Sequence, residues 1–163
     1  MIVSMIVATG QKNEIGRNNQ LMWHLPDDFK WFIRHTKHKT VVMGRNTMNS
    51  LGKPLKNRRN IVLSSSNEGI IDGFEHFVSL SHVLEILRDE EEVMIIGGAQ
   101  LYNSALPLSN RIYLTRVDAL FDDADTYFPN LNVDDWEVSY RELHGIDESH
   151  LYSFEFQILE RRN

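Results

Sequence analysis

Short apolar runs separated by polar segments dominate the pattern of this chain. Runs rich in Ile and Val are typical of strands that are buried on both faces of a sheet. They cover residues 2–8, 40–44, 60–64, 93–96 and 111–117, with a weaker candidate at 74–78. Residues 137–143 and 151–159 instead alternate apolar with polar positions, which predicts an antiparallel pair at the edge of the sheet.

Helices are expected between these strands. Residues 25–36 carry apolar side chains at helical spacing, and Pro26 suits a first turn because its missing N–H has no partner there. Shorter helices are expected at 46–51, from 79 or 81 to 87, and at 99–106, whereas 9–22 predicts a long loop. This alternation predicts an α/β fold: one domain over 1–163, with a mostly parallel twisted sheet of about eight strands, an antiparallel C-terminal edge and about four flanking helices.

Two adjacent acids open the first predicted helix. Its expected buried arc is made of Leu25, Phe29, Phe32 and Ile33. Asp27 falls on the polar side, whereas Asp28 projects about 40° from Phe32, at the edge of the arc. Either both acids favour the helix start, or Asp28 is a half-buried carboxylate at a ligand site. Helix geometry alone leaves both interpretations open.

Charge is unevenly distributed along the chain, whose net charge is −6. Residues 29–67 hold no Asp or Glu but nine of the 17 Lys and Arg residues, and residues 118–160 hold twelve of the 23 acids. The basic middle favours binding of one or two small anions, and a solvated face without a partner is the alternative. A nucleic-acid groove is disfavoured because the chain is acidic and no aromatic pattern accompanies the basic residues.

The composition excludes several classes of chemistry. With no cysteine, the chain has no disulfide, thiolate nucleophile or cysteine-ligated metal, and seven scattered histidines give no support to a metal site. No apolar run approaches the roughly 20 residues that cross a bilayer, and the N-terminal residues lack the pattern of a signal peptide. A cytoplasmic protein without membrane contacts is therefore expected.

Ligands of parallel sheets bind at the carboxyl ends of the strands. That edge is expected to gather the loop after Ala8, the turn at 44–47, Ser64 to Ser66 and Gly97-Gly98. A strand, two glycines and a helix can present backbone N–H groups to a phosphate, although most Gly-Gly pairs are only tight turns. Because G-x-G-x-x-G is absent after the first strand, an ordinary Rossmann dehydrogenase is disfavoured.

Eight segments, in family order and spacing, resemble the bacterial-type dihydrofolate reductases over essentially the whole chain. They are Ile15-Gly16, WHLPDDF at 23–29, VMGRNT at 42–47, GKPL at 52–55, RRNIVLS at 58–64, IIGGA at 95–99, YLT at 113–115 and DTYFP at 125–129. The resemblance implies NADPH-dependent reduction of 7,8-dihydrofolate, with hydride passing to C6 of the pteridine and a proton to N5. It also implies a monomer that supports one-carbon and thymidylate metabolism and is an antifolate target.

The resemblance implies a substrate site around Asp28. This residue matches the carboxylate that binds the pterin, with water as the donor of the N5 proton, and Leu21 and Trp23 complete the implied catalytic set. Arg58 matches the arginine that holds the α-carboxylate of the substrate, the alternative being a solvated loop charge. The other implied contacts, any apolar one of which could equally be core packing, are Ile6, Ala8, Phe29, Phe32, Leu51, Leu55, Ile96 and Thr115.

The resemblance also implies an NADPH site and no metal. The implied contacts are Ala8, Ile15, Gly16, Asn19, Gly44, Arg45, Asn46, Thr47, Leu63, Ser64, Ser65, Ile96, Gly97, Gly98, Ala99, Gln100, Leu101 and Tyr102. The peptide bond between the two glycines is expected to be cis.

Four positions depart from the family pattern. Met22 stands where Pro is usual, and Gln100 where an Arg often contacts the 2′-phosphate, which leaves Arg45 and the serines to select NADPH over NADH. Asn49 replaces a common acid, and Ala124 replaces a Gly beside an apparent insertion at 122–123. These changes are expected to affect lid motion and cofactor preference.

Two other functions remain open at this level. One is a pterin- or nucleotide-binding module without turnover. The presence of Asp28, Trp23, Arg58 and the glycine pair in this chain argues against it. The other is a pyrimidine reductase of riboflavin synthesis, which has a related fold but no need for Asp28 and Arg58.

Overall fold

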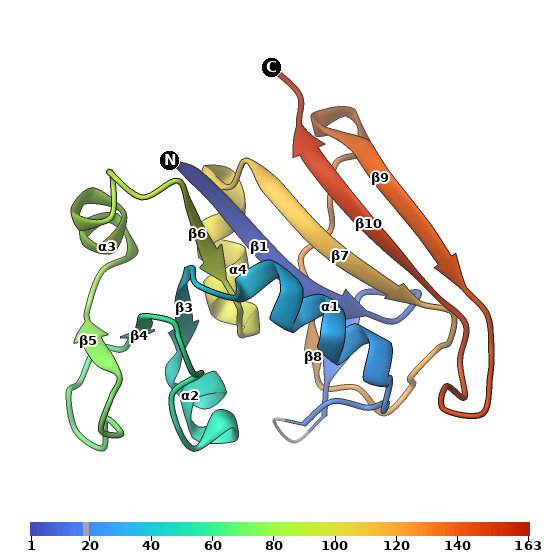
Figure 1. The fold of residues 1–163 in the computed structure, drawn as a ribbon, viewed down its shortest axis with the longest axis horizontal. Helices are drawn as coiled ribbons and strands as arrows, with labels where there is room; N and C mark the ends of the chain where they lie inside the picture. The colour runs from blue at the N-terminus through green and yellow to red at the C-terminus, as the bar shows by residue number, and fades with distance from the viewer. Residues whose placement is uncertain (18–19) are drawn as a thin grey trace.

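The computed structural model describes residues 1–17 and 20–163, and its main element is an eight-stranded sheet (Figure 1). The strands are β1 (Ile2–Thr9), β3 (Thr40–Gly44), β4 (Asn60–Leu63), β5 (Glu75–Phe77), β6 (Glu92–Ile95), β7 (Arg111–Val117), β9 (Trp136–His144) and β10 (Phe154–Arg161). Their order is β5-β4-β3-β6-β1-β7-β10-β9. Pairs from β5 to β7 are parallel, and the last two pairs are antiparallel, which confirms the predicted architecture.

Four α-helices are described, as predicted. They are α1 (Pro26–Thr36), α2 (Arg45–Leu51), α3 (Leu80–Ile86) and α4 (Ala99–Ala105), with short 3₁₀ helices η1 (Leu106–Leu108) and η2 (Val133–Asp135). In Figure 1, α1 crosses in front of the sheet and α4 lies behind it. None of the described helices has the length and apolar character to cross a membrane.

Side chains of β1 alternate between two apolar cores, one on each face of the sheet. Val3, Met5 and Val7 belong to the first core, which includes buried residues of α3 and α4. Ile6 belongs to the second core, which includes buried residues of α1 and α2. Because successive strand residues point to opposite faces, one apolar run supplies both cores.

One strand was missed, and the start of another was wrong. Residues 9–22, expected to be loop, include β2 (Glu14–Gly16), which pairs with β8 (Thr126–Tyr127) in a second, two-stranded sheet. Strands this short show no recognisable period. The last strand begins at Phe154 rather than at residue 151, because residues 147–150 form a turn closed by backbone bonds between Asp147 and His150.

The predicted buried face of α1 was wrong at Phe29 and missed Trp31, whereas Leu25 is buried and Phe32 and Ile33 are half-buried. Phe29 is 65 % exposed, whereas Trp31 is 3 % exposed and stacks on Phe156 of β10, with ring centroids 4.3 Å apart. A tryptophan buries more apolar area than a phenylalanine, so this stack decides which side of the helix meets the sheet. Asp28 lies about 60° from Trp31 around the helix and about 40° from Phe32, within the buried arc rather than at its edge.

Candidate active site

The carboxyl of Asp28 meets the sheet at β7. Oγ1 of Thr115 donates a hydrogen bond to Oδ1 of Asp28 at 2.7 Å. Burial raises the pKa of Asp28 to about 6, and the hydrogen bond from Thr115 opposes this rise only in part. The site therefore contains a carboxyl that can hold or release a proton close to neutral pH.

The second core supplies an apolar wall on the face of the sheet where this carboxyl lies. Ile6 and Trp23 are buried in that core. Five more of the predicted substrate contacts are half-buried and pack against it: Ala8, Phe32, Leu51, Leu55 and Ile96. These residues come from β1, α1, α2, the loop after α2 and the residue after β6, so the fold brings together five separate segments.

Two predicted residues lie apart from this wall. Leu21 and Phe29 have side chains that are each 65 % exposed. Trp23, by contrast, is buried against Phe121, with ring centroids 5.2 Å apart. Its indole Nε1 is buried and has no hydrogen-bond partner among the described residues, although buried donors are normally paired.

Among the described residues, Arg58 has no ion-pair partner, and its positive charge lies beyond the C-terminal end of α1. Its Nε is buried without a hydrogen-bond partner in the described part of the chain, and burial lowers the pKa of its guanidinium. Its neighbour Arg59 is instead held by Glu75, with Nε and Oε2 2.6 Å apart. An anionic group would satisfy Arg58, because a half-buried guanidinium with a free donor favours a carboxylate partner.

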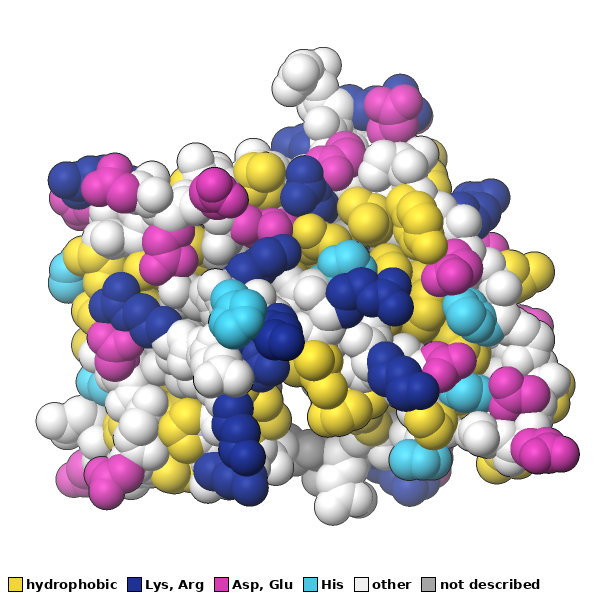
Figure 2. All heavy atoms as spheres, viewed as in Figure 1, with side chains coloured by type: hydrophobic (Ala, Val, Ile, Leu, Met, Phe, Trp, Pro, Cys, Tyr) yellow, Lys and Arg dark blue, Asp and Glu magenta, His cyan; other side chains and the backbone are white. Residues whose placement is uncertain are grey.

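Basic side chains gather on the face of the sheet that α1 and α2 cover. Figure 2 shows Lys and Arg along the middle of this face, with Asp and Glu toward its two sides and hydrophobic side chains at the surface between them. This arrangement follows the uneven charge of the sequence, in which residues 29–67 contain no acid.

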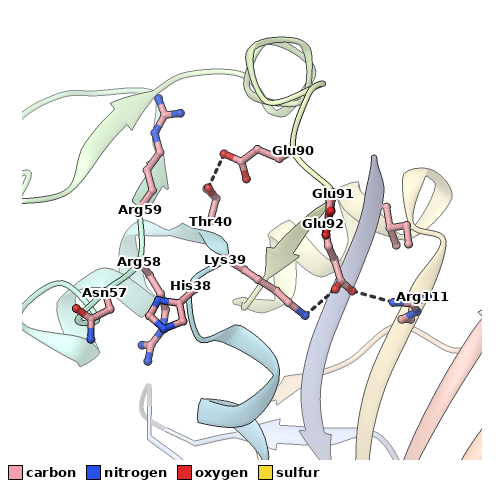
Figure 3. Close-up of a pocket in the computed structure, with 11 residues that line it drawn as sticks. His38, Lys39, Thr40, Asn57, Arg58, Arg59, Glu90, Glu91, Glu92 and Arg111 are labelled. Carbon is pink, nitrogen blue, oxygen red and sulfur yellow. Dashed lines mark hydrogen bonds and ion pairs between the residues drawn. The ribbon is translucent and has the colours of Figure 1, made fainter.

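A polar hollow of about 760 Å³ opens where the parallel strands begin, at the edge opposite Gly97-Gly98 (Figure 3). Glu92 accepts bonds there from Lys39 at 2.6 Å and from Arg111 at 3.2 Å. Figure 3 shows Arg58 beside His38, away from this paired group. Seven Lys, Arg and Glu side chains line the hollow, Arg58 among them, and Lys39, Glu92 and Arg111 neutralise one another. Because it lies at the edge of the sheet opposite the glycine pair, it is a poor candidate for the site that joins both ligands.

A glycine cradle lies at the carboxyl ends of β3 and β6, as predicted. The N–H of Gly44 donates to the carbonyl of Gly97 at 2.8 Å, and the Gly97-Gly98 bond is cis. Gly97 has φ +113°, and a Cβ added there would meet the Tyr102 side chain, the hydroxyl at 3.1 Å and the ring at 3.2 Å. Only glycine fits this conformation without strain, because a side chain here would also press on Tyr102.

Arg45 and Ser64 meet beside this cradle. Nε of Arg45 donates to Oγ of Ser64 at 3.1 Å, and its two Nη atoms donate to the carbonyls of Glu68 and Ser66 at 2.5 and 2.6 Å. Backbone carbonyls hold the guanidinium without cancelling its charge. The arrangement therefore offers a cation and a hydroxyl to a phosphate.

The remaining predicted cofactor residues differ in accessibility. Leu101 and Tyr102 are 8 % and 5 % exposed, and the Tyr102 hydroxyl donates to the carbonyl of Ile6 at 2.7 Å, so both side chains serve the first core. Asn46, Ser65 and Gln100 are exposed. Half-buried or buried positions are Ile15 and Gly16 on β2, and Thr47, Leu63, Gly98 and Ala99 near the cradle. Asn19 lies outside the described residues.

Two further residues near the site had no signal in the sequence. Glu14 is 2 % exposed, and its carboxylate accepts bonds from the N–H groups of Lys12 and Phe121 at 2.5 and 2.7 Å. His150 is 3 % exposed and accepts a bond from the N–H of Asp27 at 3.1 Å. The partners Phe121 and Asp27 are 107 and 123 residues away along the chain, beyond the reach of local patterns. In the described residues, no cluster of three or more His, Cys, Asp or Glu could hold a metal ion.

Comparison with known proteins gives concordant matches. A family model described as dihydrofolate reductase matches residues 2–161. The chain is 43 % identical to a dihydrofolate reductase of Haemophilus influenzae over 99 % of this chain and 100 % of the relative, and 37 % identical to that of Bacillus subtilis over 99 % and 96 %. A solved dihydrofolate reductase from Enterococcus faecalis, complexed with NADP(H) and RAB-propyl, superposes with a TM-score of 0.91 at 31 % identity, covering 99 % of this chain and 97 % of that one.

Proposed function

The chain belongs to the dihydrofolate reductase family, and from this premise we propose that it catalyses the NADPH-dependent reduction of 7,8-dihydrofolate to 5,6,7,8-tetrahydrofolate. The observation that carries the proposal is the Asp28 carboxyl, bonded to Thr115 at 2.7 Å and set against an apolar wall. Such a group suits a planar heterocycle with N–H donors, because Asp28 and Thr115 offer polar atoms beside apolar side chains.

Asp28 and Arg58 fit the two ends of an elongated substrate. Asp28 lies in the first turn of α1, which has 11 residues and is therefore about 16 Å long, and Arg58 lies beyond the other end. In this proposal Asp28 binds the pterin amino and ring N–H groups, and Arg58 binds the α-carboxylate of the tail. Between them, Phe32, Leu51 and Leu55 offer apolar contacts for the middle of the molecule.

The glycine cradle and Arg45 fit the cofactor. NADPH, when bound, supplies the hydride for C6 of the pteridine. Gly44 and Gly97-Gly98 allow the backbone to approach the cofactor closely, while Arg45 and Ser64 offer charge and a hydroxyl to a phosphate. Ala8 and Ile96 line both the substrate and the cofactor sides in this proposal, which places the two ligands in contact.

Protonation of N5 must accompany hydride transfer. Asp28 is assigned the task of holding the ring and tuning its affinity for a proton, while water delivers that proton. Trp23, buried against Phe121, is assigned to one side of the wall, where its ring would limit the approach of water. Leu21, with its exposed side chain, belongs in this proposal to the segment that covers the reacting rings.

Mixing the protein with NADPH and dihydrofolate and following the loss of reduced-nicotinamide absorbance tests the proposal. We expect turnover with dihydrofolate, which is severely reduced in Asp28→Asn. Tight binding of both ligands without turnover would instead indicate a binding module. Turnover of a riboflavin-pathway pyrimidine with none of dihydrofolate would indicate the pyrimidine reductase.

We further propose that residues 1–163 form one domain that acts as a monomer in the cytoplasm, binds no nucleic acid and is a target of antifolates. Two cores on opposite faces of one continuous sheet support the single domain. Light scattering after size-exclusion chromatography, with and without NADPH, measures the oligomeric state. The mass of two chains would overturn the monomer.

A further inference from the structure

The helix that carries Asp28 lacks a cap from its own sequence. Leu25 occupies the N-cap position of α1, and its apolar side chain cannot accept a hydrogen bond from the first turn. Asp28 and Phe29 donate their N–H groups to the carbonyl of Leu25. The N–H of Asp27 has no acceptor within the helix and needs one from elsewhere, as the first N–H groups of any α-helix do.

His150 supplies that acceptor from the turn between β9 and β10. The N–H of Asp27 donates to Nε2 of His150 at 3.1 Å, and the imidazole is 3 % exposed. A ring nitrogen that accepts a bond carries no proton, so Nε2 is bare and Nδ1 holds the hydrogen. Nδ1 lies 2.8 Å from Oδ1 of Asp147, which accepts that hydrogen. The neighbours of His150 therefore define a neutral ring with one tautomer.

The turn holds this ring in place. Asp147 and His150 exchange backbone bonds of 3.1 and 3.3 Å, and Oδ1 of Asp147 also accepts the N–H of Ser149 at 2.8 Å. The ring lies 5.2 Å from that of Phe154, which is 1 % exposed and opens β10. His150 therefore packs against the first residue of β10, the strand that pairs with β7. It contacts α1 on the same side of the sheet as Thr115.

The charged groups facing the ring limit what protonation would do. Oδ2 of Asp27 lies 3.8 Å from Nε2 of His150 and 4.0 Å from Nδ1 of His144. His144 also faces Glu142 at 3.3 Å, and Lys30 lies 3.8 Å from Asp27. A proton on Nε2 would remove the acceptor for the backbone N–H and attract the Asp27 carboxylate instead. The first turn would then lose its cap while gaining a charge pair.

We propose that His150 is a positioning residue for the reduction: as a neutral acceptor it fixes the first turn of α1 and so holds the Asp28 carboxyl on Thr115. The inference rests on the proposed function, since it assigns His150 to the same site. It predicts that the acceptor, rather than the charge or bulk of the side chain, is what the site requires.

Three variants isolate the acceptor. His150→Ala removes it, whereas His150→Gln keeps an oxygen at about the reach of Nε2. Asp27→Asn keeps the backbone N–H and removes the nearby carboxylate. His144→Gln is the matched control, because His144 approaches Asp27 through its side chain alone in the described contacts.

Steady-state kinetics should separate these roles. In His150→Ala we expect kcat/KM for dihydrofolate to fall about five- to tenfold, as for loss of a helix cap, while KM for NADPH stays within about twofold. The pH at which hydride transfer loses half its rate should move down, because water reaches a less firmly held Asp28. His150→Gln should restore at least half of the lost kcat/KM, and Asp27→Asn and His144→Gln should resemble the wild type.

Two results would overturn the inference. In one, His150→Ala melts at a lower temperature but keeps the wild-type kcat/KM and pH profile. His150 would then be a helix cap with a structural role alone. In the other, His150→Gln fails as fully as His150→Ala in a folded protein. Failure of the proposed function is distinguished from both, because the wild type itself would then not oxidise NADPH with dihydrofolate.

Discussion

At the scale of single residues, the same burial that prepares Asp28 for its role makes it costly to the fold. An aspartate is ordinarily ionised above pH 4, but burial raises the pKa of Asp28 to about 6. The unfolded chain therefore releases this proton more readily than the folded one. The resulting destabilisation is absent below about pH 4, grows between pH 4 and 6, and is complete above that range.

Asp28→Asn should accordingly stabilise the protein while it impairs the reaction. The shift from 3.8 to about 6 corresponds to roughly 3 kcal/mol, so we expect a gain of about 2 to 3 kcal/mol at pH 8 that disappears near pH 3.5. Denaturant unfolding at the two pH values measures it. Asp27→Asn is the control, and its stability should change by no more than about 1 kcal/mol, the usual effect of an acid in a first helical turn. Equal stability of Asp28→Asn and wild type at pH 8 would contradict the burial of a charge.

Arg58→Ala should weaken substrate binding selectively. A charge-assisted hydrogen bond is worth about 1.5 to 3 kcal/mol, so KM for dihydrofolate should rise about tenfold or more while KM for NADPH changes little. Lys56→Ala, an exposed cation in the same loop, serves as the control. Similar increases in both Michaelis constants of Arg58→Ala would remove its assignment to the substrate tail.

At the scale of elements, side chains from distant segments fix what local patterns leave open. Helical periodicity in the sequence separated Asp28 from Asp27. It did not predict the rotation of α1 correctly, because that rotation depends on the stack of Trp31 on Phe156, a residue far away in the chain. The strands of the eight-stranded sheet and the glycine cradle were predictable, since apolar runs and glycines carry local signals. The pairing of β2 with β8 and the support of α1 by His150 were not, because each depends on a contact over more than 100 residues.

Glu14 tests the importance of the segment before the site. Its carboxylate accepts bonds from the N–H groups of Lys12 and Phe121. Burial, which raises its pKa, is outweighed by bonds from its own backbone N–H and from those of Phe121 and Lys12, which lower it. In Glu14→Gln the amide NH₂ must face one of the two N–H groups. Thermal unfolding should show a loss of about 1 to 3 kcal/mol, and Glu68→Gln, at an exposed position, should show almost none. Unchanged stability of Glu14→Gln would mean that the carboxylate does not hold these loops together.

At the scale of the whole molecule, family membership, sheet topology and the position of the basic face agree. The eight-stranded sheet places the cradle of β3 and β6 next to the wall made by β1, α1 and α2, so one edge can serve two ligands. Motifs along the sequence already indicated that a substrate site and a cofactor site share this edge. The accessibility of individual cofactor residues, such as the buried Tyr102, required the folded structure.

Cofactor preference should appear in the stability of the entire fold. A ligand at one hundred times its dissociation constant stabilises the native state by about 2.7 kcal/mol. We expect NADPH to raise the melting temperature more than NADH at equal concentration, because Arg45 and Ser64 remain available to the 2′-phosphate despite the exposed Gln100. Arg45→Ala should reduce the difference between the melting-temperature shifts caused by NADPH and NADH. Equal shifts for both cofactors would show that these residues do not provide selectivity.

The central claim is that Asp28 governs reduction of the pterin, and the pH dependence of hydride transfer tests it most directly. In single turnovers with NADPH and dihydrofolate, the wild-type rate should fall as pH rises through about 6, because the reaction takes up a proton and Asp28 loses its own in that range. Asp28→Asn should be slow and should show no transition there. Wild-type and Asp28→Asn profiles of the same shape and height would contradict the account.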